Sequence, residues 1–261
     1  MASYDRFHAV VPAAGIGARV GAAVPKQYLE LAGRSLLQWS VRALLTAPFI
    51  ETVVVVVAPG DTLAGELVGH WPRVQVHAVG GASRRDSVLA GLRAAGAGWQ
   101  PGDWVLVHDA ARPALSLAAL NRLRAGLQDD PVGGLLALPV SDTVKQAPAG
   151  QPRVERTVSR EGLWLAQTPQ MFRHGLLLAA LTDHPGVTDE AGAMEAAGHV
   201  PRLIEGERHN FKVTTADDLR LMGAWLSALA EGGDGGAVDG DHGAEGTAAR
   251  PFAGPAQGRS E

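Results

Sequence analysis

The chain has 261 residues, no cysteine and a formal net charge of −4. This length is enough for one substantial hydrophobic core, and the lack of cysteine excludes disulfides, thiol nucleophiles and thiolate metal sites. The first residues show no cationic segment followed by an apolar one, and no apolar run approaches the roughly 18 residues that cross a bilayer. We therefore expect neither a secretory signal nor a membrane partner, and a cytoplasmic location, which a cysteine-free chain fits.

The negative charge is concentrated at the end of the chain. Residues 231–261 hold six acids, two arginines and nine glycines, with few large apolar side chains. Such a segment cannot bury enough apolar area to offset its ordering entropy, so we expect a disordered, acidic, Gly-rich tail after a domain formed by residues 1–230. That domain is neutral overall and has no basic footprint for nucleic acid.

Strand-like apolar runs alternate with helical patterns over the first half of the chain. Strands are expected at Phe7–Val11, Thr52–Ala58, Val74–Val79 and Trp104–Val107. Helices are expected around Leu37–Leu44, Asp61–His70, Ser83–Ala95 and Leu117–Leu127. This alternation is typical of βαβ units and predicts a doubly wound, mostly parallel α/β sheet.

The pattern changes after Leu138. Residues 139–160 alternate polar and apolar positions on both sides of Pro148–Pro152, which predicts a β-hairpin arm projecting from the sheet. Because such an arm has little core of its own, we expect it to pack on a second subunit. The remaining expected elements are helices at Gly175–Leu181 and Asp189–Ala197, extended segments at Val200–Glu205 and His209–Val213, and a last helix capped by Thr215 that buries Leu219, Met222, Leu226 and Leu229.

A glycine-rich loop follows the first expected strand and reads P-A-A-G-I-G-A-R, with P-K-Q-Y a few residues later. Gly15 and Gly17 allow consecutive backbone amides to converge on an anion, and Arg19 and Lys26 add two positive charges, a combination that suits a polyphosphate. Val20 stands where a dinucleotide-binding motif needs its third glycine, and the Gly-Lys-Ser/Thr of a P-loop is absent. The glycines alone would also be explained by an ordinary tight turn.

Polar clusters also follow later strands, at the sheet edge where ligands gather in open α/β folds. In G-G-A-S-R-R-D-S-V, Gly81 and Ser87 are suited to approach a base or ribose, although a turn before a Ser83 helix cap would look the same. In H-D-A-A-R-P, Asp109 is a hard oxygen ligand suited to Mg²⁺, and Arg112 can bind a phosphate; a turn closed by this pair is the alternative.

The remaining polar motifs are weak when each is taken alone. D-T-V-K at Asp142–Lys145 could be a solvated strand face, and T-P-Q at Thr168–Gln170 could be a turn. T-D-E at Thr188–Glu190 could be a helix cap. We place K-V-T (Lys212–Thr214) at a strand end, where its lysine could simply be solvated. The nine histidines form no H-x-x-x-H pair, and no G-x-S-x-G elbow supports acyl hydrolysis.

Taken together and in order, these motifs resemble the 2-C-methyl-D-erythritol 4-phosphate cytidylyltransferases of the non-mevalonate isoprenoid pathway. The resemblance covers residues 6–228. It implies a Rossmann-like nucleotidyltransferase fold, CTP as co-substrate, Mg²⁺ or another divalent cation, and a homodimer whose arms cross to complete the partner's site. Ribitol-5-phosphate cytidylyltransferases share most of the motifs and remain the alternative. A non-catalytic nucleotide-binding module is a remoter one.

The resemblance also implies roles by matching position. Residues that would hold CTP are Ala13, Ala14, Gly15, Gly17, Gly81 and Ser87, while Arg19, Lys26 and Lys212 would be catalytic. Asp109 would bind the metal and substrate, and the other substrate-binding residues would be Arg112, Thr143, Arg160, Thr168, Thr188 and Thr214. Ala82 and Ser159 stand where the family often has Asp, which affects one contact to cytidine and the placement of Arg160.

Overall fold

The computed structural model describes residues 5–15, 24–95 and 98–231, so nearly all of the expected tail lies outside the described residues. Seven strands form one mixed sheet in the order β11-β7-β10-β6-β1-β4-β5. Their bounds are β1 Phe7–Pro12, β4 Ile50–Val56, β5 Val74–His77, β6 Trp104–Val107, β7 Gly133–Pro139, β10 Trp164–Arg173 and β11 Arg202–Glu205. Only β10 runs antiparallel to its neighbours, which confirms the expected mostly parallel α/β sheet.

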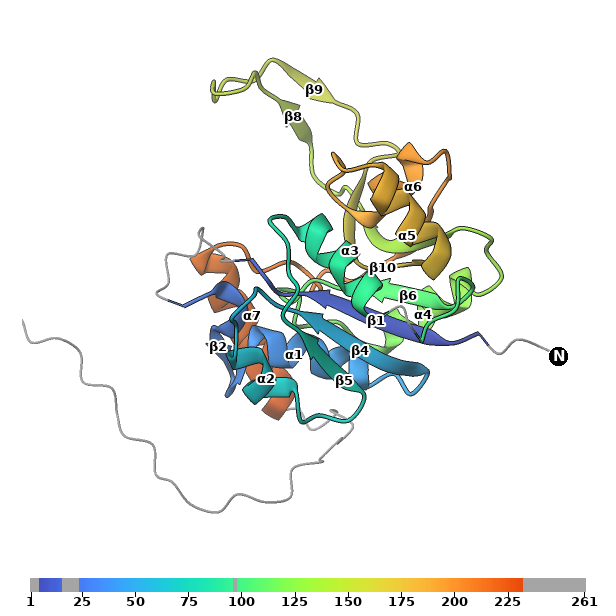
Figure 1. Cartoon of the computed structure of the whole chain (residues 1–261). Helices are drawn as coiled ribbons and strands as arrows, with labels where there is room; N and C mark the ends of the chain where they lie inside the picture. Colours follow the sequence, from blue (N-terminus) through green and yellow to red (C-terminus); the bar gives the residue numbers. More distant parts are fainter. Residues whose placement is uncertain (1–4, 16–23, 96–97, 232–261) are drawn as a thin grey trace, which may run out of the picture.

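Helices cover both faces of this sheet (Figure 1). On one face α1 (Leu36–Leu45), α2 (Leu63–Val68) and α4 (Leu117–Leu127) share a core with inward side chains of β1, β4 and β6. On the other face the core is completed by α3 (Arg84–Ala95), α5 (His174–Asp183) and α6 (Glu190–Ala196). The last helix, α7 (Ala216–Glu231), packs Met222 and Leu226 in a smaller cluster with Leu36 of α1. No helix in the described part of the chain has the length and apolar character needed to cross a membrane.

Local sequence explains why these elements begin where they do. Four consecutive valines of β4 are fully buried, as expected of a parallel strand covered on both faces. A capping box formed by Ser35 and Gln38 starts α1, and the Ser83 hydroxyl accepts from the backbone amide of Asp86 at the start of α3. The Thr215 cap of α7 is confirmed by a 3.1 Å bond from the Asp218 amide.

The expected strands and helices of the first half are confirmed, but three expectations fail later in the chain. The segment His209–Val213 forms no strand, because its amides pair locally or with the loop after β6: Asn210 with Glu207, and Val213 with Ala111. Lys212 and Thr214 therefore do not end a strand. Leu229, expected in the core, is 54% exposed. The antiparallel strand β10 was missed, because Pro169 and the polar residues around it resemble a turn.

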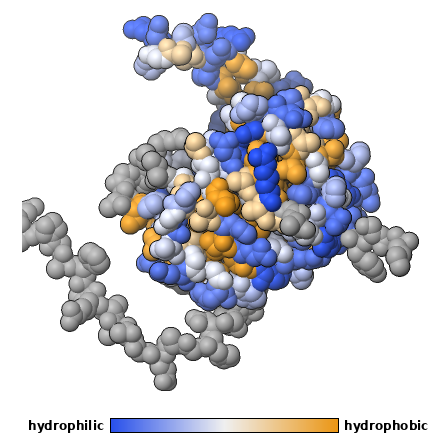
Figure 2. Space-filling model, in the orientation of Figure 1, coloured by the Kyte–Doolittle hydropathy of each residue, from blue (hydrophilic) through white to orange (hydrophobic). Residues whose placement is uncertain are grey.

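The expected arm is a two-stranded hairpin, β8 (Val144–Gln146) and β9 (Arg156–Val158), paired antiparallel. It stands clear of the rest of the described structure (Figure 1). Figure 2 shows that its tip is hydrophilic and that hydrophobic residues lie nearer the body. An isolated hairpin of this size is marginally stable in water, so a packing partner would stabilise it.

The order of the strands fixes where a ligand can enter. From β1 the chain builds outward through β4 to β5 and then returns to place β6 on the other side of β1. The connection after β1 therefore leads to β4 on one side, and the connection after β6 leads to β7 on the other side. In open α/β sheets, such a topological switch point opens a crevice that binds ligands.

Candidate active site

A cavity of about 450 Å³ lies at this switch point. Its walls come from the loops after β1, β5 and β6, the start of α3, the 3₁₀ turn η2 (Lys26–Tyr28) and the segment before α7. The described residues that line it are Pro12, Ala13, Ala14, Gly15, Lys26, Gln27, Gly81, Ala82, Ser83, Arg84, Ser87, Asp109, Ala110, Ala111 and Lys212.

Lys26 and Gln27 of the K-Q-Y turn line the cavity, and all three side chains of this turn form hydrogen bonds with other parts of the chain. Lys26 Nζ donates to the Val213 carbonyl at 2.8 Å, and Gln27 Nε2 donates to the Ala13 carbonyl at 2.7 Å. The Tyr28 hydroxyl donates to Asp61 at 2.6 Å, and burial together with this carboxylate raises the pKa of the tyrosine. The turn thus fixes both the end of β1 and the lysine beside it.

The double glycine before α3 is required by packing. A Cβ on Gly80 would lie 2.3 Å from the Ala14 Cβ, and one on Gly81 would lie 2.5 Å from the Asp86 Cβ. The loop after β5 can therefore approach the loop after β1 closely. The buried Ser87 hydroxyl fixes this loop, because it accepts from the Gly81 amide and donates to the Ser83 carbonyl.

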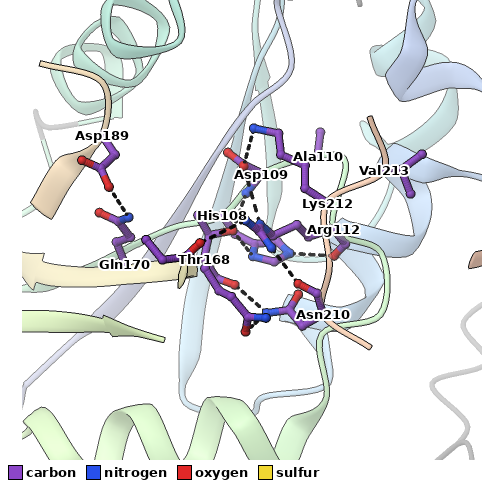
Figure 3. A network of polar contacts seen from close by, with 12 residues as sticks. His108, Asp109, Ala110, Arg112, Thr168, Gln170, Asp189, Asn210, Lys212 and Val213 are labelled. Atoms are coloured by element: carbon purple, nitrogen blue, oxygen red, sulfur yellow. Dashed lines mark hydrogen bonds and ion pairs between the residues drawn. The ribbon is translucent and has the colours of Figure 1, made fainter. Parts of the chain in front are cut away.

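Asp109 is the acidic centre of the cavity (Figure 3). Arg84 Nε contacts its Oδ1 at 2.7 Å, and Lys212 Nζ contacts its Oδ2 at 2.8 Å. Arg112 Nε lies 3.7 Å from Oδ2. Burial alone would raise the pKa of Asp109, but Arg84 and Lys212 hold it well below its usual value. The carboxylate is therefore ionised at neutral pH, which metal binding requires.

A second carboxylate lies behind Arg84. The two terminal nitrogens of Arg84 contact Glu190 at the start of α6, at 2.8 and 3.0 Å, and the glutamate is fully buried. Burial lowers the pKa of Arg84, but Glu190 and Asp109 outweigh it and raise that pKa above its ordinary value. Arg84 is thus a permanent cation held between two carboxylates.

A buried polar network supports Asp109 from below (Figure 3). The Thr168 hydroxyl accepts from the Asp109 amide at 3.1 Å and lies 3.0 Å from His108 Nδ1. His108 Nε2 lies 3.0 Å from the Arg112 carbonyl, which only accepts, so Nε2 carries the proton and Nδ1 accepts from Thr168. Burial lowers the pKa of His108 to about 4. The imidazole is therefore neutral, and it links the Thr168 hydroxyl to the Arg112 carbonyl.

The structure brings most of the predicted residues together. The described residues Ala13, Ala14, Gly15, Lys26, Gly81, Ser87, Asp109 and Lys212 line one cavity, while Gly17 and Arg19 lie outside the described residues. Thr168 lies behind Asp109. Thr214 donates to Asp218 at 2.7 Å and so helps to begin α7. Arg112 is not among the lining residues, because its guanidinium donates to the carbonyls of Asn210 and Ala166.

Three predicted substrate residues lie away from the cavity of their own chain. Thr143 and Arg160 are exposed at the base of the arm, where Arg160 donates to the Ser141 carbonyl. Thr188 is exposed just before α6. None of the three is among the described residues that line the cavity.

Sequence reasoning missed Arg84 and Glu190. The run S-R-R-D offers two adjacent arginines, and the second, Arg85, pairs with Asp86 and the Leu181 carbonyl instead. The spacing of residues along the helix could have identified Arg84. With a helix beginning after Ser83, Arg84 shares a face with Ser87 three positions later, and Ser87 is among the residues that the resemblance implies would hold CTP.

The cavity fits a divalent cation held mainly by a substrate. No group of three or more His, Asp or Glu side chains suited to a metal occurs among the described residues. Asp109 is the one acid among the described lining residues. A single carboxylate suits Mg²⁺, which takes its other oxygens from phosphates and water.

A doubly wound sheet with a cavity of backbone amides, lysines and one carboxylate at its switch point defines a nucleotidyltransferase. Comparison with known proteins makes this specific. The chain belongs to the 2-C-methyl-D-erythritol 4-phosphate cytidylyltransferase (IspD) family, whose family model matches residues 7–228.

Individual relatives agree along nearly their whole length. The 2-C-methyl-D-erythritol 4-phosphate cytidylyltransferase of Bordetella pertussis is 56% identical over 226 residues, which cover 84% of this chain and 97% of that protein. A crystal structure of a 4-diphosphocytidyl-2C-methyl-D-erythritol synthase is 37% identical and superposes with a TM-score of 0.76, covering 85% of this chain and 99% of the other. The Francisella tularensis IspD structure is 32% identical, with a TM-score of 0.73 and the same coverage.

Proposed function

We propose that the cavity at the ends of β1 and β6 carries out the cytidylyl transfer of this family. CTP and 2-C-methyl-D-erythritol 4-phosphate give 4-diphosphocytidyl-2-C-methyl-D-erythritol and pyrophosphate, a step in isoprenoid precursor synthesis. The observation that carries the proposal is the meeting of Lys26, Asp109 and Lys212 in one cavity from three distant parts of the sequence.

The reaction is a direct in-line displacement. A phosphate oxygen of the acceptor attacks the α-phosphorus of CTP, the new P–O bond forms, and the bond to the β-phosphate breaks to release pyrophosphate. The second pKa of a phosphate monoester is about 6, so the nucleophile is largely ionised at neutral pH and needs no strong base. This agrees with the neutral, fully engaged His108. Catalysis then consists of positioning and charge stabilisation.

Each charged side chain has a role in that scheme. Lys26 and Lys212 face oxygens that gain negative charge in the transition state. Arg19 is part of the same proposal and lies outside the described residues. Asp109 would hold a divalent cation together with the triphosphate, and that cation would neutralise phosphate charge when bound. The backbone of Ala13, Ala14 and Gly15 would contact CTP.

The arm completes the proposal. Thr143 and Arg160 lie at the base of the arm, away from the cavity of their own chain, and Trp164 and Leu165 at the same base are 41% and 58% exposed. A homodimer in which the arm packs on a partner would cover this apolar surface and bring Thr143 and Arg160 to the partner's cavity. A cytoplasmic location belongs to the same proposal and draws on the absence of cysteine.

One assay tests the reaction. Pyrophosphate release is measured with each of four nucleoside triphosphates and two acceptors, 2-C-methyl-D-erythritol 4-phosphate and ribitol 5-phosphate. We expect release with CTP and the methylerythritol acceptor. A preference for ribitol 5-phosphate would support the alternative transferase. Nucleotide binding without release for any pair would support a non-catalytic nucleotide-binding module.

A further inference from the structure

Glu190 is a fully buried carboxyl side chain that lies behind Arg84, away from the cavity. It begins α6, its exposure is 0%, and both of its oxygens are taken by the terminal nitrogens of Arg84 at 2.8 and 3.0 Å. It is also absent from the described residues that line the cavity. The hydrogen bonds of the Glu190 side chain therefore lead to the cavity through Arg84.

Arg84 contacts both Glu190 and Asp109. Its third nitrogen, Nε, donates to Asp109 Oδ1 at 2.7 Å, so one planar guanidinium bridges both carboxylates. Three donors in a rigid plane fix the guanidinium in position and orientation. Oδ2 has a different partner: the Lys212 ammonium at 2.8 Å, on a flexible side chain that is 37% exposed. Asp109 thus has a fixed partner at Oδ1 and a more mobile one at Oδ2, where Arg112 Nε lies farther away, at 3.7 Å.

The far end of this chain of contacts is attached to the sheet. Gln170 of β10 donates to Asp189 at 2.9 Å and accepts from the Ala191 amide at 2.7 Å, so the residues on both sides of Glu190 are held. Asp189 also caps α6 through the Gly192 amide. Contacts therefore run without a break from β10 through α6 and Arg84 to Asp109.

We propose that Glu190 is a positioning residue for cytidylyl transfer: it fixes Arg84, and Arg84 orients Asp109. Oδ2, which Lys212 contacts, would then be the oxygen able to hold a divalent cation, and Lys212 would move aside. This inference rests on the proposed function and adds to it a residue that lies away from the cavity.

A purely structural role is the competing explanation. Buried ion pairs are weak evidence for stability, since well-packed apolar residues often serve as well. A pair kept only for stability would not need a third bond to a carboxylate in the cavity. Outer partners of a metal ligand typically change metal affinity by about 10- to 100-fold when removed. The two explanations therefore differ in a binding measurement.

The experiment is a calorimetric titration of CTP without acceptor, with Mg²⁺ and separately with EDTA. For Glu190→Gln we expect Mg²⁺-dependent CTP binding at least about tenfold weaker, and binding in EDTA within about twofold of the unchanged protein. The Mg²⁺ concentration for half-maximal pyrophosphate release should rise in parallel. The matched control is Asp103→Asn, another buried carboxylate paired with an arginine, Arg6, but at the amino ends of β1 and β6. It should leave both titrations unchanged.

A double variant tests whether Glu190 acts through Arg84. If it does, Glu190→Gln combined with Arg84→Gln should bind CTP and Mg²⁺ no more weakly than Arg84→Gln alone, whereas independent roles would multiply the losses. A Glu190→Gln protein with a lower melting temperature but unaltered Mg²⁺-dependent binding would overturn the inference. Should that variant not fold, Glu190→Asp, which keeps the charge but is one methylene shorter, is titrated instead and judged by the same criteria. Failure of the unchanged protein to release pyrophosphate from CTP would instead overturn the proposed function.

Discussion

Lys26 Nζ donates a hydrogen bond to the carbonyl oxygen of Val213, 2.8 Å away and 187 positions later in the sequence. The residue before Val213 is Lys212, whose ammonium contacts Asp109. One contact therefore joins the turn after the glycine-rich loop to the segment that carries the second lysine. Two cations from distant parts of the sequence therefore line one cavity.

Replacing Lys26 tests whether this arrangement is catalytic. For Lys26→Ala we expect kcat to fall on the order of 10²–10³, the usual result of removing one preorganised donor to a charge that develops in the transition state. Steady-state kinetics with CTP and the methylerythritol acceptor measure it. Arg220→Ala, which removes an exposed cation from α7, is the control. A kcat within a few-fold of the unchanged protein, with only KM raised, would assign Lys26 to ground-state binding.

The elements read most reliably from sequence are those defined by local patterns. Val53–Val56 of β4 and Trp104–Val107 of β6 are continuous apolar runs, and both are fully buried strands. The antiparallel strand β10 depends on pairing with β6 and β7 instead, and its buried Thr168 and Gln170 bond to groups far away in sequence. The pattern of apolar and polar residues within the strand does not reveal such long-range contacts.

The candidate site divides in the same way. Gly81 and Asp109 follow strands that the sequence defines, so their meeting at one edge of the sheet could be predicted. Lys212 lies in an irregular segment that is placed by the bond from Val213 to Ala111, and the partners of Arg84 come from the loop after β6 and from α6. These positions depend on tertiary packing, so they cannot be predicted from the spacing of residues in the sequence.

Gly80 should tolerate no side chain. A Cβ there would lie 2.3 Å from the Ala14 Cβ and 2.7 Å from the Val57 carbonyl oxygen, so we expect Gly80→Ala to lower the free energy of unfolding by about 1–3 kcal/mol. Urea unfolding measures the change. Gly65→Ala in α2, where a Cβ meets nothing within 4 Å, is the matched control and should stabilise by up to about 1 kcal/mol. Equal effects of the two substitutions would contradict the packing argument.

The arm prediction concerns assembly. Leu165 is 58% exposed at the start of β10, beside the base of the arm. If that surface is a subunit interface, Leu165→Arg should convert a dimer to a monomer in light scattering, because an unpaired charge would be buried there. Activity should fall at least about tenfold, since Thr143 and Arg160 would no longer reach a partner. Leu221→Arg on α7, at 62% exposure, is the control and should remain dimeric. A monomeric unchanged protein would refute the prediction.

His108 should make the fold sensitive to acid. Its pKa is about 4 in the folded chain, against about 6.5 for an unperturbed histidine. Between these values the unfolded chain binds more protons than the folded one. The contribution of His108 to the free energy of unfolding is therefore fully present above pH 6.5 and is lost as the pH falls toward 4. Integration over this window gives a loss of about 3 kcal/mol.

The test compares urea unfolding at pH 7 and pH 4.5. His108→Gln cannot titrate but can still donate to the Arg112 carbonyl, so we expect its stability to fall by about 2–3 kcal/mol less than that of the unchanged chain over this range. The buried His8, whose pKa burial also lowers to about 4, is present in both proteins and cancels from the comparison. The exposed His70→Gln substitution controls for the loss of a histidine as such. An identical pH dependence for His108→Gln and the unchanged chain would show that the folded imidazole takes up a proton as readily as the unfolded one, in conflict with its burial and its hydrogen bond from Thr168.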